Sequence, residues 1–309
     1  MAQTKEISRR IKSISSTKKI TKAMEMVAAA KMRKAIEAVL KTRAYASLSW
    51  ETVLRLAALE KSKNENTHPL LAARPEIKKA AVILVTSNRG MCGGYNTAVI
   101  NKAEQSLEKH GEVKTDFILA GRKGASVYQH GHVVAAEFEK EDVLNDVQEI
   151  YPIVKMALND YLSGKYDKIF VAYTDFINPA KQVPRVKQLL PVEIEKNEAY
   201  LGAASLNVQE GIDKPHETPA AATLEYAFEP SPREVLDMMI PRLLEIQLFQ
   251  AFLEANASEH SARMTAMHQA TEAASDMVSE LTLFYNKARQ AGITAEIAEI
   301  SAGANALAE

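Results

Sequence analysis

The sequence of 309 residues has few of the features that cross-link a small fold or anchor a chain in a bilayer. Cys92 is its single cysteine, so an internal disulfide is excluded. No uninterrupted apolar run approaches the roughly 20 residues that a transmembrane helix needs. Any association with a membrane must therefore go through a partner.

Proline and glycine are missing from a long N-terminal stretch, between Thr4 and about Lys63. Within it Ile7, Ile11 and Ile14 follow one another at spacings of four and three, the spacing of one helical face. Sixty residues at about 1.5 Å each would form a rod of roughly 90 Å, as one helix or as two. We therefore predict a long helical segment over residues 1–68, ended by the polar stretch before Pro69.

The C-terminal segment, residues 231–309, carries a second helical pattern. Ser231, Pro232 and Glu234 are typical of a capped helix start, with serine as the N-cap and proline at the first helical position. Spacings of three and four then continue for some forty residues through Ile246, Phe249, Leu253, Asn256, His260, Met264, Met267, Thr271, Ala274, Val278, Leu281, Tyr285 and Ala288. A stripe of this length predicts a coiled-coil seam, and its small and polar members predict loose packing.

The charges of the two ends are opposed. The first 34 residues hold ten lysines and arginines against Glu6 and Glu25, whereas residues 230–309 hold eleven acids against five basic residues. Two long helices of opposite charge at the ends of one chain can bury their stripes against each other. We expect them to pair as an antiparallel coiled coil.

The middle of the chain, residues 69–230, alternates short apolar runs with helical patterns. The runs at 79–86, 116–120 and 168–173 predict strands, and residues 96–109 and 143–163 predict helices. Such alternation is typical of a Rossmann-like α/β domain with a mainly parallel sheet. Residues 197–222 lack either pattern and are interpreted as an irregular insertion.

No motif in the chain predicts an active site, a cofactor site or a metal site. The turn at 86–94 follows a strand and precedes a helix, but it has neither the Gly-x-Gly-x-x-Gly spacing nor the Lys-Ser/Thr pair of a phosphate-binding loop. Its glycines, like Gly121, are interpreted as backbone requirements of tight turns. Cys92 is expected to be a small buried residue, and the histidines do not cluster with acids at ligand spacing.

Two other functions are compatible with the pattern. A nucleotide-binding α/β protein with helical extensions would explain the turn at 86–94, and tight nucleotide binding would favour it. A coiled-coil protein that binds nucleic acid would use the basic segment 5–34, although that segment has no aromatic residue for base stacking. Neither accounts for two long helices on either side of a sheet domain that has few motifs.

Four segments of the chain resemble the gamma-subunit family of F-type ATP synthases. They are KITKAMEMVAAAKMRK at 19–34, SNRGMCGGYN at 87–96, ASEHSARMTAM at 257–267 and YNKARQAGIT at 285–294. The resemblance extends in order over nearly the whole chain, with the Gln-Val-Pro and Gln-Leu-Leu-Pro stretches at 182–184 and 188–191 between them.

The resemblance implies a central rotary shaft of the F1 sector, a non-catalytic subunit that couples proton flow through a membrane ring to ATP synthesis or hydrolysis and regulates both. It implies one copy per complex, with an alpha/beta hexamer in a 3:3 ratio, the epsilon and delta subunits and the c-subunit ring as partners. The implied location is the cytoplasmic side of a bacterial cell membrane, held there by the complex.

The family's contact positions can be carried over residue by residue. Met24 matches a position that meets the acidic lever loop of the beta subunit, and Glu259 and Arg263 match positions at its catch loops. The upper-shaft contacts with the hexamer match Arg289, Gln290, Thr294, Glu296 and Glu299, and the c-ring contacts match Tyr226 and Glu229. Asn88 stands where the family usually has aspartate, and residues 197–222 form a longer insertion without cysteine.

Overall fold

The computed structural model describes residues 2–62, 68–72, 74–109, 113–192, 229 and 231–308. Its elements, in chain order, are α1 (Ala2–Ser62), β1 (Lys79–Val85), α2 (Tyr95–Lys109), β2 (Lys114–Ala120), η1 (Arg122–His130), β3 (Val133–Phe138), η2 (Val147–Ile150), α3 (Tyr151–Leu162), β4 (Lys168–Asn178), β5 (Lys181–Leu190) and α4 (Pro232–Ala308). The insertion predicted at 197–222 lies outside the described residues.

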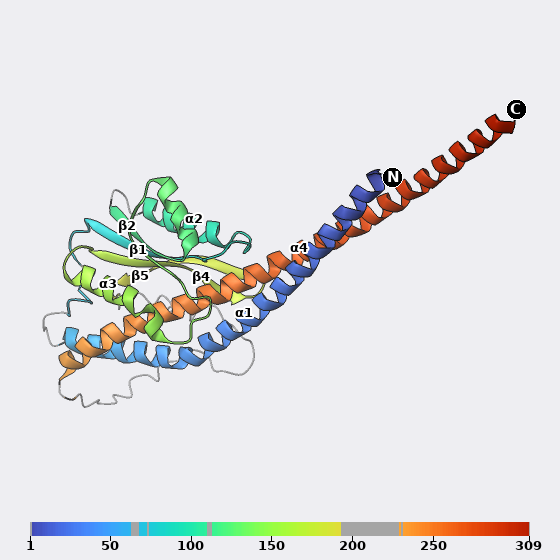
Figure 1. Cartoon of the computed structure of the whole chain (residues 1–309). Helices are drawn as coiled ribbons and strands as arrows, with labels where there is room; N and C mark the ends of the chain where they lie inside the picture. Colours follow the sequence, from blue (N-terminus) through green and yellow to red (C-terminus); the bar gives the residue numbers. More distant parts are fainter. Residues whose placement is uncertain are drawn as a thin grey trace. The chain divides into compact units, whose positions relative to one another are not determined.

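Both terminal segments form the long helices that the sequence predicts, and α1 is one continuous helix (Figure 1). At the start of α4 the backbone N–H of Glu234 donates to the Ser231 hydroxyl at 3.3 Å, and the Ser231 hydroxyl reaches the Glu234 carboxylate at 3.2 Å. Pro232 supplies the first helical residue. The capped start read from the sequence is confirmed.

The chain divides into two compact units, and the division passes through both long helices. The helical unit comprises Met1–Ala29 and Arg263–Glu309, and the globular unit comprises Ala30–Ala262. The sequence predicts three consecutive segments, 1–68, 69–230 and 231–309. Their boundaries lie between the long helices and the sheet domain, whereas the boundaries of the two compact units lie within the long helices.

The globular unit is built on a five-stranded sheet in the order β3-β2-β1-β4-β5. The pairs β1–β2, β1–β4 and β2–β3 are parallel, whereas β4–β5 is antiparallel. The mainly parallel sheet is therefore confirmed. The apolar pattern predicted neither edge strand, because β3 is only half buried and β5 contains Pro184, which a sheet tolerates at its edge.

The central strand β1 shows how side chains assign the two faces of the sheet. Its residues from Ala80 to Val85 are all buried. Val82 and Leu84 pack with Val99 of α2, whereas Ala81, Ile83 and Val85 belong to the cluster that includes α3 and α4. Because successive side chains of a strand point to opposite faces, α2 covers one face and α3 and α4 cover the other. Figure 1 shows the same arrangement.

Candidate functional site

Helix α4 is completely enclosed where it crosses the sheet. Every residue from 243 to 261 is buried, a run of nineteen. Nine of these residues are polar or charged: Glu245, Gln247, Gln250, Glu254, Asn256, Ser258, Glu259, His260 and Ser261. Burying a polar group without a hydrogen-bond partner costs free energy, so the bonds of these side chains show how the helix is held.

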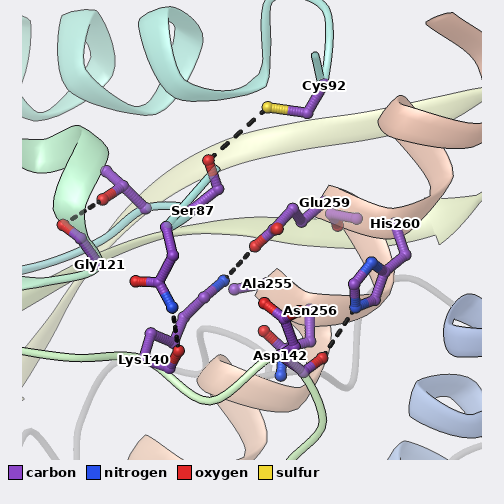
Figure 2. A network of polar contacts seen from close by, with 12 residues as sticks. Ser87, Cys92, Gly121, Lys140, Asp142, Ala255, Asn256, Glu259 and His260 are labelled. Carbon is purple, nitrogen blue, oxygen red and sulfur yellow. Dashed lines mark hydrogen bonds and ion pairs between the residues drawn. The ribbon is translucent and has the colours of Figure 1, made fainter. Parts of the chain in front are cut away.

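One side of α4 is held by the loop that follows β3. We call Lys140, Glu141 and Asp142 the strap. The Asn256 amide donates to the Glu141 carbonyl at 3.2 Å, and Nε2 of His260 lies 2.8 Å from the Asp142 carbonyl. Figure 2 shows the strap lying along α4 with these side chains pointing toward it.

The strap also carries a buried ion pair. Nζ of Lys140 lies 2.5 Å from a carboxylate oxygen of Glu259, and the two side chains are 0% and 1% exposed. The ammonium group is also 6.0 Å from the centre of the Tyr95 ring. Two opposite charges enclosed in this way require each other, because either one alone would be buried without compensation.

The strap is tied to other elements of the globular unit as well. The side-chain amide of Asn88, in the turn after β1, donates to the Lys140 carbonyl. Asp142 forms an ion pair with Lys31 of α1 at 2.7 Å. Burial of Asp142 opposes its ionisation, but the bond and charge of Lys31 outweigh this effect and hold the pKa of Asp142 below its usual value.

The amide at Asn88 explains the departure from the aspartate that the family resemblance leads one to expect. Its nitrogen donates to the strap, and its oxygen accepts from the backbone N–H of Arg122 at 3.4 Å. An aspartate could accept the second bond but would place a carboxylate against the Lys140 carbonyl oxygen. In this chain the side chain at position 88 is therefore a donor on one side and an acceptor on the other.

The opposite side of α4 is held by β4 and β5. Ser258 donates to the Thr174 carbonyl at 3.0 Å, and Ser261 donates to the Pro179 carbonyl at 2.8 Å. The Gln182 amide donates to the Ser261 hydroxyl at 3.2 Å. Short polar side chains on the helix thus bond to the backbone of the β4–β5 hairpin.

A second buried pair joins α4 to the sheet one turn earlier. Burial raises the pKa of Glu254 well above its usual value, and the neighbouring Asp175 raises it further. In its protonated form Glu254 can donate a hydrogen bond to Asp175. Oδ2 of Asp175 lies 2.7 Å from Nε of Arg185 on β5.

The turn after β1 satisfies its own polar groups. Cys92 is buried, as predicted, with its sulfur 3.3 Å from the Asn96 amide and 3.7 Å from the Ser87 hydroxyl. Gly121 has a φ of 104°, and a Cβ there would lie 2.4 Å from the Thr86 carbonyl oxygen, so its backbone role is confirmed. Over the described ranges, no three His, Cys, Asp or Glu side chains are grouped to hold a metal ion.

In the helical unit the two helices run antiparallel, as predicted. Lys18 bonds to Ser275 at 2.9 Å, the Thr21 and Thr271 hydroxyls are 2.8 Å apart, and Glu25 lies 3.3 Å from His268. The residue numbers of each pair add up to 292 or 293. In this register α1 reaches its first residue opposite about residue 290 of α4, and α4 continues without it.

From residue 293 to residue 302 the side chains of α4 are exposed. Ile293, Ile297 and Ile300 are 49%, 62% and 72% exposed and lie on one helical face at spacings of four and three. An apolar face of this kind is typical of a surface that another protein covers.

The positions carried over from the family fall into four groups. Met24 and Arg263 are half-buried in the helical unit, and five residues of α4 are exposed: Arg289, Gln290, Thr294, Glu296 and Glu299. Glu229 is exposed, and Tyr226 lies outside the described residues. Glu259 is enclosed in the globular unit, where it binds Lys140.

Sequence reasoning missed the buried polar contacts of α4. It interpreted Asn256 and His260 as members of a loose seam, whereas both are fully buried and bond to strap carbonyls. The dense apolar composition of residues 243–253 could have indicated a helix buried on all sides. Nothing near Lys140 in the sequence pointed to Glu259.

Comparisons with known proteins agree with this architecture. The family model described as ATP synthase matches residues 3–307. The chain is 40% identical to the ATP synthase gamma chain of Roseiflexus castenholzii, with 100% of both chains covered, and 39% identical to that of Moorella thermoacetica, covering 99% of this chain and 100% of the other.

Solved structures share the fold at low sequence identity. A chain of the Euglena gracilis mitochondrial ATP synthase, described as OSCP/F1/c-ring, has a TM-score of 0.63 at 17% identity and covers 99% of this chain and 95% of its own. A chain of the Tetrahymena thermophila mitochondrial ATP synthase, described as central stalk/c-ring, has a TM-score of 0.57 at 21% identity. The match covers 81% of this chain and 99% of the other.

Within the part of the chain that the structure describes, no helix has both the length and the apolar character needed to cross a membrane. The match over the full length and the two long helices around a mainly parallel sheet lead to one assignment. The chain belongs to the family of ATP synthase gamma chains, the non-catalytic subunits that form the central stalk of the rotary F1 complex.

Proposed function

We propose that this chain is the shaft that couples proton flow through a membrane ring to ATP synthesis or hydrolysis at an alpha/beta hexamer, and that it thereby regulates both. One observation carries the proposal. A single helix is enclosed by the globular unit over residues 243–261, and the same helix exposes charged and apolar side chains over residues 289–300. A helix built in this way is anchored in one part and offers contacts to partners in another.

The proposed contacts with the hexamer are the half-buried Met24 and Arg263 and the exposed residues of α4, which are Arg289, Gln290, Thr294, Glu296 and Glu299. Tyr226 and Glu229 are proposed to contact the c ring. Glu259 acts inside the chain in this proposal, because its carboxylate is buried against Lys140. The epsilon and delta subunits complete the complex, which holds one copy of the chain.

The mechanism follows from stiffness and asymmetry. The paired helices of the helical unit present a different face in each direction, and past about residue 290 only α4 continues. A turning rod of this kind offers each beta subunit a different set of contacts in succession. Because a contact shifts a conformational equilibrium only by its differential affinity for the two states, rotation would change nucleotide affinity at each site in turn.

The proposed location is the cytoplasmic side of the cell membrane, reached only through the complex. The test is co-purification of the tagged full-length chain from membranes. Recovery of an alpha/beta hexamer with ATPase activity, in a ratio of three of each to one tagged chain, is the expected result. Recovery of the chain without the hexamer would refute the proposal.

A further inference from the structure

The polar bonds around α4 are concentrated in one short segment, residues 255–261, which we call the collar. The strap binds Asn256, Glu259 and His260, and the β4–β5 hairpin binds Ser258 and Ser261. The Tyr95 hydroxyl, at the start of α2, donates to the Ala255 carbonyl at 3.2 Å. The collar ends two residues before Arg263, where the helical unit begins along the chain.

The two sets of bonds hold α4 from opposite sides. In a helix of 3.6 residues per turn each residue advances by about 100°, so Asn256, Glu259 and His260 fall within about 100° of one another. On the same scale the midpoint between Ser258 and Ser261 lies about 180° away from that group. Bonds on opposite sides of a cylinder resist its rotation about the axis in either direction.

We propose that the collar is the joint that prevents α4 from turning about its own axis inside the globular unit, and that Lys140 is its main positioning residue. The inference rests on the function proposed above, in which α4 has to carry torque. Apolar contacts have little directionality, so they define the angle of a helix less sharply than hydrogen bonds do. Hydrogen bonds depend strongly on distance and angle.

The geometry limits the angle through which α4 can turn before the bonds of the collar break. A side-chain atom roughly 5.5 Å from the helix axis moves by roughly 3 Å when the helix turns by about 30°. A displacement of that size breaks a hydrogen bond. The bonds to the strap and to the hairpin would therefore be lost together, and the helix angle is defined to well within 30°.

Lys140 is central because it links α4 to the turn that follows β1. Its ammonium group binds Glu259 of α4, its carbonyl accepts from Asn88 in the turn after β1, and its side chain is fully buried. A force on the turn after β1 is thus transmitted to α4 through the buried side chain of Lys140. Glu141 and Asp142 add only backbone acceptors on this face of α4.

The test uses the assembled enzyme with Lys140→Met in this chain. In purified complexes reconstituted in vesicles, we expect ATP hydrolysis to be retained and ATP-driven proton pumping per ATP to fall roughly threefold or more. The torsional stiffness of the rotor, measured with a bead attached to the globular unit of single molecules, should fall with it. The charge swap Lys140→Glu with Glu259→Lys should restore both quantities.

Two further variants make the outcome interpretable. Lys165→Met removes an ion pair with Asp160 that is 43% and 19% exposed in the same unit, and it should change neither quantity. Ser258→Ala with Ser261→Ala loosens the other side of the collar without removing a charge, and it should lower stiffness even if Lys140→Met does not assemble. Unchanged stiffness and pumping in assembled collar variants would overturn the inference, as would a charge swap that assembles but restores nothing. Failure of the unaltered chain to assemble would refute the proposed function instead.

Discussion

Replacing Lys140 alone should destabilise the globular unit more than replacing Lys140 and Glu259 together. The two side chains are 0% and 1% exposed, so Lys140→Met leaves a carboxylate buried without its counter-ion. Breaking a buried pair in this way costs about 3–5 kcal/mol. In Lys140→Met with Glu259→Leu no charge is left to desolvate, and apolar side chains of similar volume should recover most of that loss.

The assay is urea unfolding of the full-length chain followed by tryptophan fluorescence. The only tryptophan, Trp50, packs against the hydrophobic cluster of the globular unit, so its signal reports the unfolding of that unit. Lys165→Met is the matched control, because its more exposed pair should be worth less than about 1 kcal/mol. The difference between the single and the double variant gives the coupling free energy.

Two results would refute this reasoning. A Lys140→Met chain as stable as the unaltered one would mean that water or another cation reaches Glu259. A double variant no more stable than Lys140→Met would mean that the cost arises from lost packing and not from the unpaired charge.

Four further predictions follow from the geometry. Glu254→Gln should flatten the pH dependence of stability. Because the pKa of Glu254 is raised in the native state, that state binds more protons than the unfolded chain. The stability that Glu254 contributes at low pH is therefore lost as the pH rises from the ordinary carboxyl pKa through the raised native pKa. Asn88→Asp should cost about 1–3 kcal/mol, because the strap carbonyl loses its donor and faces a carboxylate. Gly121→Ala should cost about 1–3 kcal/mol or more, since φ is 104° and a Cβ would lie 2.4 Å from a backbone oxygen. Arg263→Ala should weaken coupling or assembly without a direct effect on nucleotide binding.

Each of these predictions has a direct measurement. Urea midpoints across pH that change equally in Glu254→Gln and the unaltered chain would contradict the first. Unfolding by Trp50 fluorescence measures the second and third, and unchanged midpoints in Asn88→Asp or Gly121→Ala would count against the bonds and strain described. For Arg263→Ala, ATP-driven proton pumping equal to that of the unaltered complex would argue against a coupling role.

The sequence alone determined the parts of this protein that depend on local patterns. The spacing of Ile7, Ile11 and Ile14, and the capped start at Ser231, report periodicity and hydrogen bonding within a few residues, and both long helices are present. The central strands are runs of apolar residues because a parallel sheet is covered on both faces. The weakly patterned edge strands β3 and β5 gave no comparable signal.

The tertiary structure alone decided what those elements touch. Lys140 and Glu259 are 119 residues apart, and only the path of the strap along α4 brings them together. Asn256 and His260 have the spacing of a helical stripe whether they face a partner helix or the strap carbonyls. Periodicity specifies which residues share a face of a helix, whereas the neighbour of that face is set by the packing of the whole unit.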